Sequence, residues 1–192
     1  PINPIIMKHI TFFALFFLFL FSYLSTIGQQ NIVDPIEKAK KNPNQSKDQA
    51  NDFGNLAWDL RSSDHNKAEL YAQKKLSISK SLKYYEGITD AYNILAVIEN
   101  NKGNDVKARL FNEKNLELAI PKKDTYVIAR ANFQIGNIYI KLGAIDKALN
   151  YFIKAEDDFK TLENRETQLS MVQNSMGSAY HDLNSLDTAL IY

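Results

Sequence analysis

Four alanines recur at a nearly constant spacing, and this recurrence constrains the fold more than any other feature of the chain. They are separated by 40, 40 and 41 residues, and each is followed three positions later by an aromatic residue. The alanines are Ala68, Ala108, Ala148 and Ala189, and the aromatic residues are Tyr71, Phe111, Tyr151 and Tyr192. Such a period is typical of stacked repeats, whose units bury their apolar faces against one another. The sequence therefore predicts an array of about four units.

Each unit divides into two helices joined by a bend. Five residues before each alanine stands a residue type that ends helices or adopts a positive φ angle, namely Ser63, Gly103, Gly143 and Asn184. Thirteen and ten residues before each alanine are two positions on one helix face, which we expect to be buried. They are Asn55, Leu95, Ile135 and Met176, and then Trp58, Ile98, Ile138 and Ala179. The pattern predicts helices over residues 47–61, 65–80, 86–101, 105–118, 124–141, 145–162, 167–182 and from 186 onward.

The units resemble the tetratricopeptide repeat family. The third unit matches the signature best, with Ile135-Gly136, Tyr139, Gly143, Ala148, Phe152 and Ala155, and the fourth keeps Met176-Gly177, Tyr180, Asn184 and Ala189. The second keeps Leu95-Ala96, Gly103 and Ala108, but has Glu99 and Asn115 where the signature has tyrosine and a small residue; the first keeps only Trp58, Ala68 and Tyr71. The period exceeds the family's usual value of about 34 residues, which implies longer helices or connections.

This resemblance implies an all-α fold, a right-handed α-solenoid of antiparallel helix hairpins over residues 47–192, with the last repeat truncated. In such a fold small residues such as Gly136 and Gly177 allow a neighbouring helix to approach closely, and the aromatic residues fill the space between hairpins. The alternative is an ordinary helical bundle whose repeats are coincidental. The number of positions that recur together favours the solenoid.

The first 46 residues have a different character from the repeats. We interpret residues 1–6 as upstream translated sequence, Met7 as the start, residues 7–28 as a signal peptide cleaved before Gln29, and residues 29–46 as a polar lead-in. The apolar run over residues 10–24 is shorter than the roughly 20 residues that span a bilayer. The sequence therefore favours export to the periplasm, and an uncleaved anchor formed by residues 10–24 is the alternative.

The composition argues against several classes of function. The 23 lysines and arginines are balanced by 22 acidic residues and scattered among them, so no nucleic-acid partner is expected. There is no cysteine, and we find no metal-binding, cofactor-binding or phosphate-binding motif. We interpret His65 as a capping residue at a bend, and we expect His181 and Asp182 to point apart. The sequence therefore predicts no catalytic site in this chain.

A groove on the concave surface remains as the candidate site. By matching positions, the resemblance implies that the first helices of the hairpins present Asn93, Arg130, Asn137, Lys141 and Asn174 there. Asparagine amides can bind a peptide backbone, and the cations can bind a carboxylate. The alternative is that these are ordinary solvated residues of amphipathic helices. The family's carboxylate clamp requires more cations than these faces carry, so we do not transfer it.

Tyr84 and Tyr85, before Gly87, are a second candidate surface, although packing between hairpins would explain them equally well. The resulting function is a protein-binding or peptide-binding scaffold. One hypothesis makes the chain the amino-terminal sensory or interaction part of a longer receptor, of the kind that resembles exported sensor proteins of Bacteroidetes. The alternatives are a free-standing periplasmic adaptor, and an adaptor segment of an enzyme such as a sensor histidine kinase whose catalytic domain lies elsewhere. A membrane would be reached only through residues 10–24 or a downstream segment.

Overall fold

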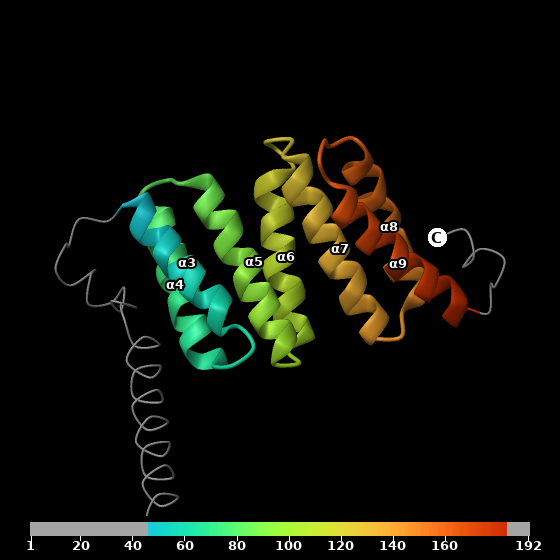
Figure 1. The fold of residues 1–192 in the computed structure, drawn as a ribbon, viewed down its shortest axis with the longest axis horizontal. Helices are drawn as coiled ribbons and strands as arrows, with labels where there is room; N and C mark the ends of the chain where they lie inside the picture. The colour runs from blue at the N-terminus through green and yellow to red at the C-terminus, as the bar shows by residue number, and fades with distance from the viewer. Residues whose placement is uncertain (1–45, 184–192) are drawn as a thin grey trace, which may run out of the picture. The chain divides into compact units, whose positions relative to one another are not determined.

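The structure, a computed structural model, describes residues 46–183, and all of its regular structure there is helical (Figure 1). Seven helices follow one another within this range, joined by short connections. They are α3 (Lys47–Leu60), α4 (His65–Ser81), α5 (Tyr85–Asn101), α6 (Asp105–Ala119), α7 (Thr125–Lys141), α8 (Ile145–Lys160) and α9 (Glu166–Asp182). Each of these helices begins and ends within two residues of the bounds expected from the repeat. The interpretations of residues 1–45, the helix from 186 onward, Asn184 and Ala189 fall outside the described residues.

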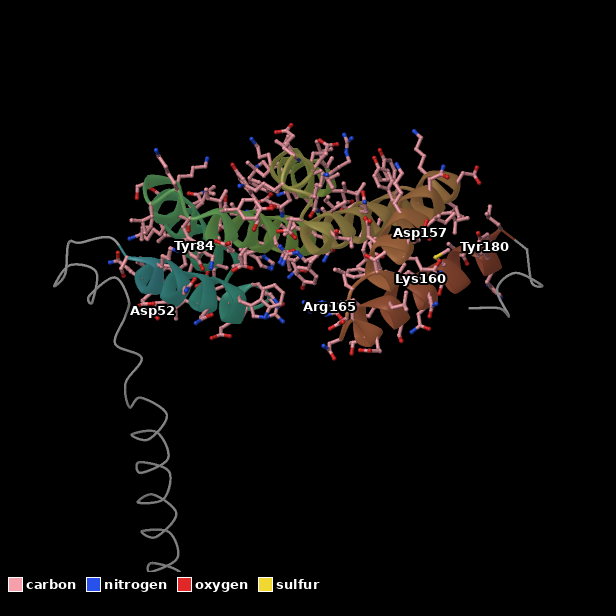
Figure 2. All side chains as sticks on the ribbon, turned by 90° about the horizontal axis from the view of Figure 1, so that it is seen from above. Asp52, Tyr84, Asp157, Lys160, Arg165 and Tyr180 are labelled. Carbon is pink, nitrogen blue, oxygen red and sulfur yellow. The ribbon has the colours of Figure 1, made fainter. Side chains whose placement is uncertain are left out.

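The helices pair into antiparallel hairpins, α3 with α4, α5 with α6 and α7 with α8, and α9 packs against α8. Consecutive hairpins stack on one another, so the described part of the chain is an α-solenoid. Along the row α3 contacts α5, α5 contacts α7 and α7 contacts α9, whereas α4 makes no contact with α6, and α6 none with α8. The first helices of the hairpins are therefore closer together than the second helices. Such a row curves, and its concave side carries α3, α5, α7 and α9; Figure 2 shows α3 and α9 on one side and α6 on the other.

The bends inside the second and third hairpins depend on glycine at a positive φ angle. Gly103 has φ of 78° and Gly143 has φ of 69°, as the sequence predicts. In both bends the next residue donates its backbone N–H to a carbonyl five residues earlier, Asn104 to Glu99 at 2.8 Å and Ala144 to Tyr139 at 2.9 Å. This is the hydrogen bond of a helix that closes around a left-handed residue. The connections between hairpins contain the same hydrogen bond around a residue with a positive φ angle. That residue is Lys83 (φ 51°) in one connection and Lys123 (φ 55°) in the next, and the sequence pattern did not predict either.

The bend of the first hairpin includes Ser63, as predicted, but its geometry differs from that of the next two. Ser63 does not take a positive φ angle. The connection instead contains four residues, 61–64, where the next two hairpins have three. Asp64, and not His65, caps α4, because its side chain accepts a hydrogen bond from the backbone N–H of Lys67 at 3.1 Å.

The additional bend residue shifts the register of α3 by one position relative to Ala68. The residues that α3 buries are Ala50, Phe53, Gly54 and Ala57. Trp58 is 41% exposed and Asn55 is exposed, so the prediction that they form the buried stripe of the first unit is wrong. In the other three units the stripe is buried as predicted, at Leu95 and Ile98, Ile135 and Ile138, and Met176 and Ala179.

The second helices bury the small residues on which the repeat is built. Ala68, Ala108, Ala148 and Ala155 have no exposed surface, and Tyr71 is 8% exposed. Their aromatic neighbours pair with rings of the first helices, at centroid distances of 6.0 Å for Tyr71 with Phe53, 6.0 Å for Phe111 with Tyr92 and 5.5 Å for Tyr151 with Tyr139. Gly177 and Tyr180 are half-buried on α9.

The third hairpin shows why one helix needs glycine. A Cβ atom added to Gly136 of α7 would lie 2.5 Å from the ring of Phe152 on α8. Phe152 has no exposed surface and packs against Phe133 of α7 with ring centroids 5.8 Å apart. A missing side chain on one helix thus accommodates a large one on the next, as the sequence predicts. We call this contact between the two helices of a hairpin its seam.

Candidate functional site

A pocket of about 380 Å³ lies on the concave side, between the first helices of three consecutive hairpins. Residues of α3, α5 and α7 line it. They are Gly54, Asn55 and Trp58 from α3, Asp90, Asn93 and Ile94 from α5, and Tyr126, Arg130 and Gln134 from α7. The walls combine three side-chain amides with two aromatic rings, an arginine and a carboxylate. This is a composition suited to polar, oriented contacts with a bound chain rather than to a purely apolar ligand.

Two of the five groove residues expected from the sequence line this pocket. They are Asn93, which is 7% exposed, and Arg130, which is half-buried. Asn137 is half-buried further along α7, and Asn174 is exposed on α9; neither lines the pocket.

Lys141 is the fifth expected residue, and it contacts the neighbouring hairpin instead. Its Nζ donates a hydrogen bond to Oδ1 of Asn100 at 2.5 Å and lies 3.8 Å from a carboxylate oxygen of Asp105. One repeat earlier, Asn101 donates its side-chain N–H to the carbonyl of Arg61 at 3.0 Å. The last residue of a first helix therefore contacts the bend region of the previous hairpin in both cases, which explains why Lys141 is absent from the pocket.

Several lining residues were not identified from the sequence. Tyr126 and Gln134 lie four residues to either side of the predicted Arg130 and share its face of α7, so the helical spacing alone contained this signal. Trp58 and Asn55 were assigned to the core because the register of α3 was taken from Ala68. The additional bend residue turns both toward the pocket instead.

A buried lysine lies behind the pocket wall. Lys75 of α4 is 3% exposed, and its Nζ forms an ion pair with Oδ2 of Asp90 on α5 at 2.8 Å. Its side chain crosses α3 at Gly54, where an added Cβ atom would lie 2.6 Å from Nζ. The side chain of Asp90 is 45% exposed, and its negative charge is thus already balanced by Lys75 of the preceding hairpin. A side chain added at Gly54 would therefore require the end of the Lys75 side chain to move.

Arginine side chains lie against both aromatic walls. The guanidinium of Arg61 is 4.1 Å from the ring centroid of Trp58. The ring of Tyr126 has two such neighbours, Arg130 at 5.4 Å and Arg165 at 4.3 Å. Arg165 precedes α9, and Figure 2 shows it on the same side of the row as α3 and α9.

Tyr84 and Tyr85 are half-buried and are engaged in contacts within the array. Lys47 Nζ lies 4.6 Å from the centroid of Tyr84. The hydroxyl of Tyr85 donates a hydrogen bond to Oδ2 of Asp124 at 3.0 Å, and Asp124 caps α7. Burial and this hydrogen bond raise the pKa of Tyr85 to about 12. These contacts favour the packing interpretation of the two tyrosines over a separate binding patch.

His181 and Asp182 are neighbours at the end of α9. His181 Nδ1 lies 3.7 Å from Oδ1 of Asp182, so the expectation that these two side chains point apart is wrong. Both side chains are more than half exposed, so solvent screens this contact. Across residues 46–183 there is no cluster of three or more histidine, cysteine or acidic residues able to hold a metal ion. No helix in that range is both long and apolar enough to cross a bilayer.

Comparison with solved structures identifies the fold. The crystal structure of BtubC (BKLC) from P. vanneervenii superimposes with a TM-score of 0.70 at 22% identity, over 82% of this chain and 65% of that one. The apo form of RapI superimposes with a TM-score of 0.68 at 20% identity, over 76% of this chain and 41% of that one. The fold is a TPR-like helical repeat. The chain spans less than two thirds of either structure, and neither the family models nor the curated proteins searched contain a match to it.

Proposed function

We propose that this chain is a scaffold that binds a protein or peptide in the concave pocket between α3, α5 and α7. The observation that carries the proposal is the lining itself, in which Asn55 of α3, Asn93 of α5 and Gln134 of α7 place amides around one cleft. A carboxamide offers both a donor and an acceptor, so it can bind the N–H and C=O groups of an extended backbone. Stacked helical repeats present extended concave surfaces that proteins of this architecture use for binding.

The test is capture of a partner by the intact pocket and not by an altered one. The immobilised chain and an Asn93→Ala, Arg130→Ala variant are incubated with extract of the producing cells, and bound proteins are compared by mass spectrometry. Arg109→Ala is the matched control, because Arg109 lies on α6 and pairs with Glu113 at 3.0 Å. We expect a partner that the control retains and the pocket variant loses. Equal recovery by all three proteins would argue against this pocket.

We propose further that the chain is exported. The order of cationic, apolar and small residues between Met7 and Gln29 supports this. Fusion of residues 1–34 to a reporter that is active only outside the cytoplasm tests the proposal, with Leu18→Lys and Leu20→Lys in the apolar run as the control. Sequencing of the secreted amino terminus distinguishes cleavage before Gln29 from retention of residues 10–24 as an anchor.

Within this proposal, the chain serves as the amino-terminal interaction part of a longer receptor. The alternatives are a free-standing adaptor, and an adaptor segment attached to an enzyme such as a sensor kinase. The gene downstream of the codon for Tyr192 distinguishes them. A stop codon within one or two further repeats would exclude the receptor, and a membrane span followed by a signalling domain would support it.

A further inference from the structure

The geometry points to an acidic side chain of an internal peptide segment as the group bound at the α7 end of the pocket, between Arg130 and Arg165. This inference rests on the proposed function and specifies the chemistry of the partner. Three observations carry it: the position of the two guanidiniums on one ring, the lack of carboxylate partners for them among residues 46–183, and the amides that line the pocket together with Arg130.

The two arginines are held in place by the ring of Tyr126. Their guanidiniums lie 5.4 Å and 4.3 Å from its centroid. The ring is itself fixed from α8, because it packs edge-on against Phe159, which is 2% exposed, at a centroid distance of 6.3 Å. A cation–π contact forms no conventional hydrogen bond, so the N–H donors of these guanidiniums remain available to an acceptor. The arrangement therefore preorganises donors at the edge of the pocket.

No acceptor within the described chain satisfies these donors. Among residues 46–183, neither Arg130 nor Arg165 has a carboxylate within ion-pair distance, whereas Arg109 on α6 pairs with Glu113 at 3.0 Å. The one carboxylate that lines the pocket, that of Asp90, is bound by Lys75 at 2.8 Å. The α7 end of the pocket thus has uncompensated positive charge, which favours an anionic ligand.

The walls next to the arginines indicate that the anion belongs to a chain that continues on both sides. Asn93 and Gln134 border Arg130 and offer neutral amides suited to a backbone, and Trp58 on the opposite wall offers an apolar face. The pocket spans three helices and is an open cleft, not an enclosed cavity. An aspartate or glutamate inside an extended segment, with an apolar residue beside it, fits this arrangement. Its carboxylate would bind the two arginines, its backbone would bind the amides, and the apolar neighbour would contact Trp58.

The single tryptophan of the chain is Trp58, so the pocket contains its own fluorescent reporter. Three synthetic peptides are titrated into the full chain. The first is acetyl-Gly-Ala-Glu-Leu-Glu-Ala-Gly-amide, the second replaces both glutamates by glutamine, and the third is the glutamine peptide with a free carboxyl terminus. Binding of each is measured by tryptophan fluorescence and by calorimetry, in low and in physiological salt.

We expect the capped acidic peptide to bind at least about tenfold more tightly than its glutamine counterpart, with an affinity that falls as salt is added. Arg130→Gln and Arg165→Gln, tested separately, are each expected to remove most of that difference. Arg109→Gln, on α6, is expected to leave it unchanged. Circular dichroism verifies that each variant retains its helices.

Equal affinity for the capped acidic and glutamine peptides would overturn the inference, and so would tight binding of the free-terminus peptide alone, which would assign the arginines to a terminal carboxylate. If neutral peptides bind and Asn93→Ala weakens them, the pocket still binds peptides and only the acidic preference fails. If none of the three peptides binds, the inference is wrong, while the capture experiment described above decides the proposed function independently.

Discussion

The second and third hairpins have the same helices at the same spacing, yet they pack through different chemistry. In the hairpin of α7 and α8, the seam contains Phe152 and Ala155, both without exposed surface. Forty residues earlier, the hairpin of α5 and α6 has Asn112 and Asn115 at those positions, each 1% exposed. The Oδ1 atoms of both asparagines are buried without a hydrogen-bond partner.

A buried polar atom without a partner costs free energy, so the two seams contribute unequally to stability. The α5–α6 hairpin is held in addition by an ion network. Lys102 Nζ lies 2.7 Å from Glu69 and 2.9 Å from Glu99, and Asn104 donates to Glu99 at 2.8 Å. The repeat therefore preserves helix length and stacking geometry, whereas each interface uses its own means of holding the helices together.

The largest effect is expected when the apolar seam is broken. Phe152→Ala removes a fully buried ring that fills the space beside Gly136 and Phe133. We expect the free energy of unfolding to fall by about 3–5 kcal/mol. Urea unfolding followed by circular dichroism measures this. A loss below about 1 kcal/mol would mean that the seam is less tightly packed than the contacts indicate.

An intermediate effect is expected when the same seam is overfilled. Gly136→Ala places a Cβ atom 2.5 Å from the ring of Phe152, so the ring or α7 must move. We expect a loss of about 1–3 kcal/mol, although alanine is the better helix former. The double variant Gly136→Ala, Phe152→Leu tests the cause, because the smaller side chain should recover part of the loss. Additive losses in the double variant would contradict this explanation.

A change of the opposite sign is expected in the polar seam. Asn115→Ala removes one of the unpartnered buried oxygens and introduces the residue that the third hairpin has at the equivalent position, Ala155. We expect a gain of about 1 kcal/mol, after the small cavity is offset against the removed polar group. The reciprocal change, Ala155→Asn, should destabilise the chain. The same unfolding measurement applies to both, and a destabilised Asn115→Ala would show that this amide is satisfied in solution.

The smallest effect concerns pH. Burial would raise the pKa of Glu99, but hydrogen bonds from Lys102 and Asn104 outweigh it and hold the pKa below its ordinary value. A carboxylate with a lowered folded-state pKa contributes stability above its unfolded pKa, and that contribution is lost as pH falls through the folded value. Glu99→Gln should therefore flatten the decline in stability between about pH 5 and pH 3. Parallel profiles for variant and parent would exclude this role.

The repeat made most of the fold predictable. Helix bounds followed from the alanine period and from Gly103 and Gly143, because a positive φ angle and a hydrogen-bonded helix end depend on neighbouring residues alone. The pocket was less predictable. Asn93 and Arg130 were identified by matching positions. Lys75 reaches Asp90 from α4, and Arg165 reaches Tyr126 from the connection before α9, and no local pattern links these residues to the pocket.

The sequence by itself determined that the chain consists of stacked helix hairpins, since the period and the alternation of small and large residues are properties of the linear chain. Only the tertiary structure decided which side chains enter the pocket. One additional residue in the first bend rotates α3 and turns Trp58 from the expected core to the concave surface. Successive residues of an α-helix are rotated by about 100° about its axis, so one inserted residue moves every side chain to a different face of the helix. Which of these side chains line a pocket then depends on the surface that the neighbouring helices leave uncovered.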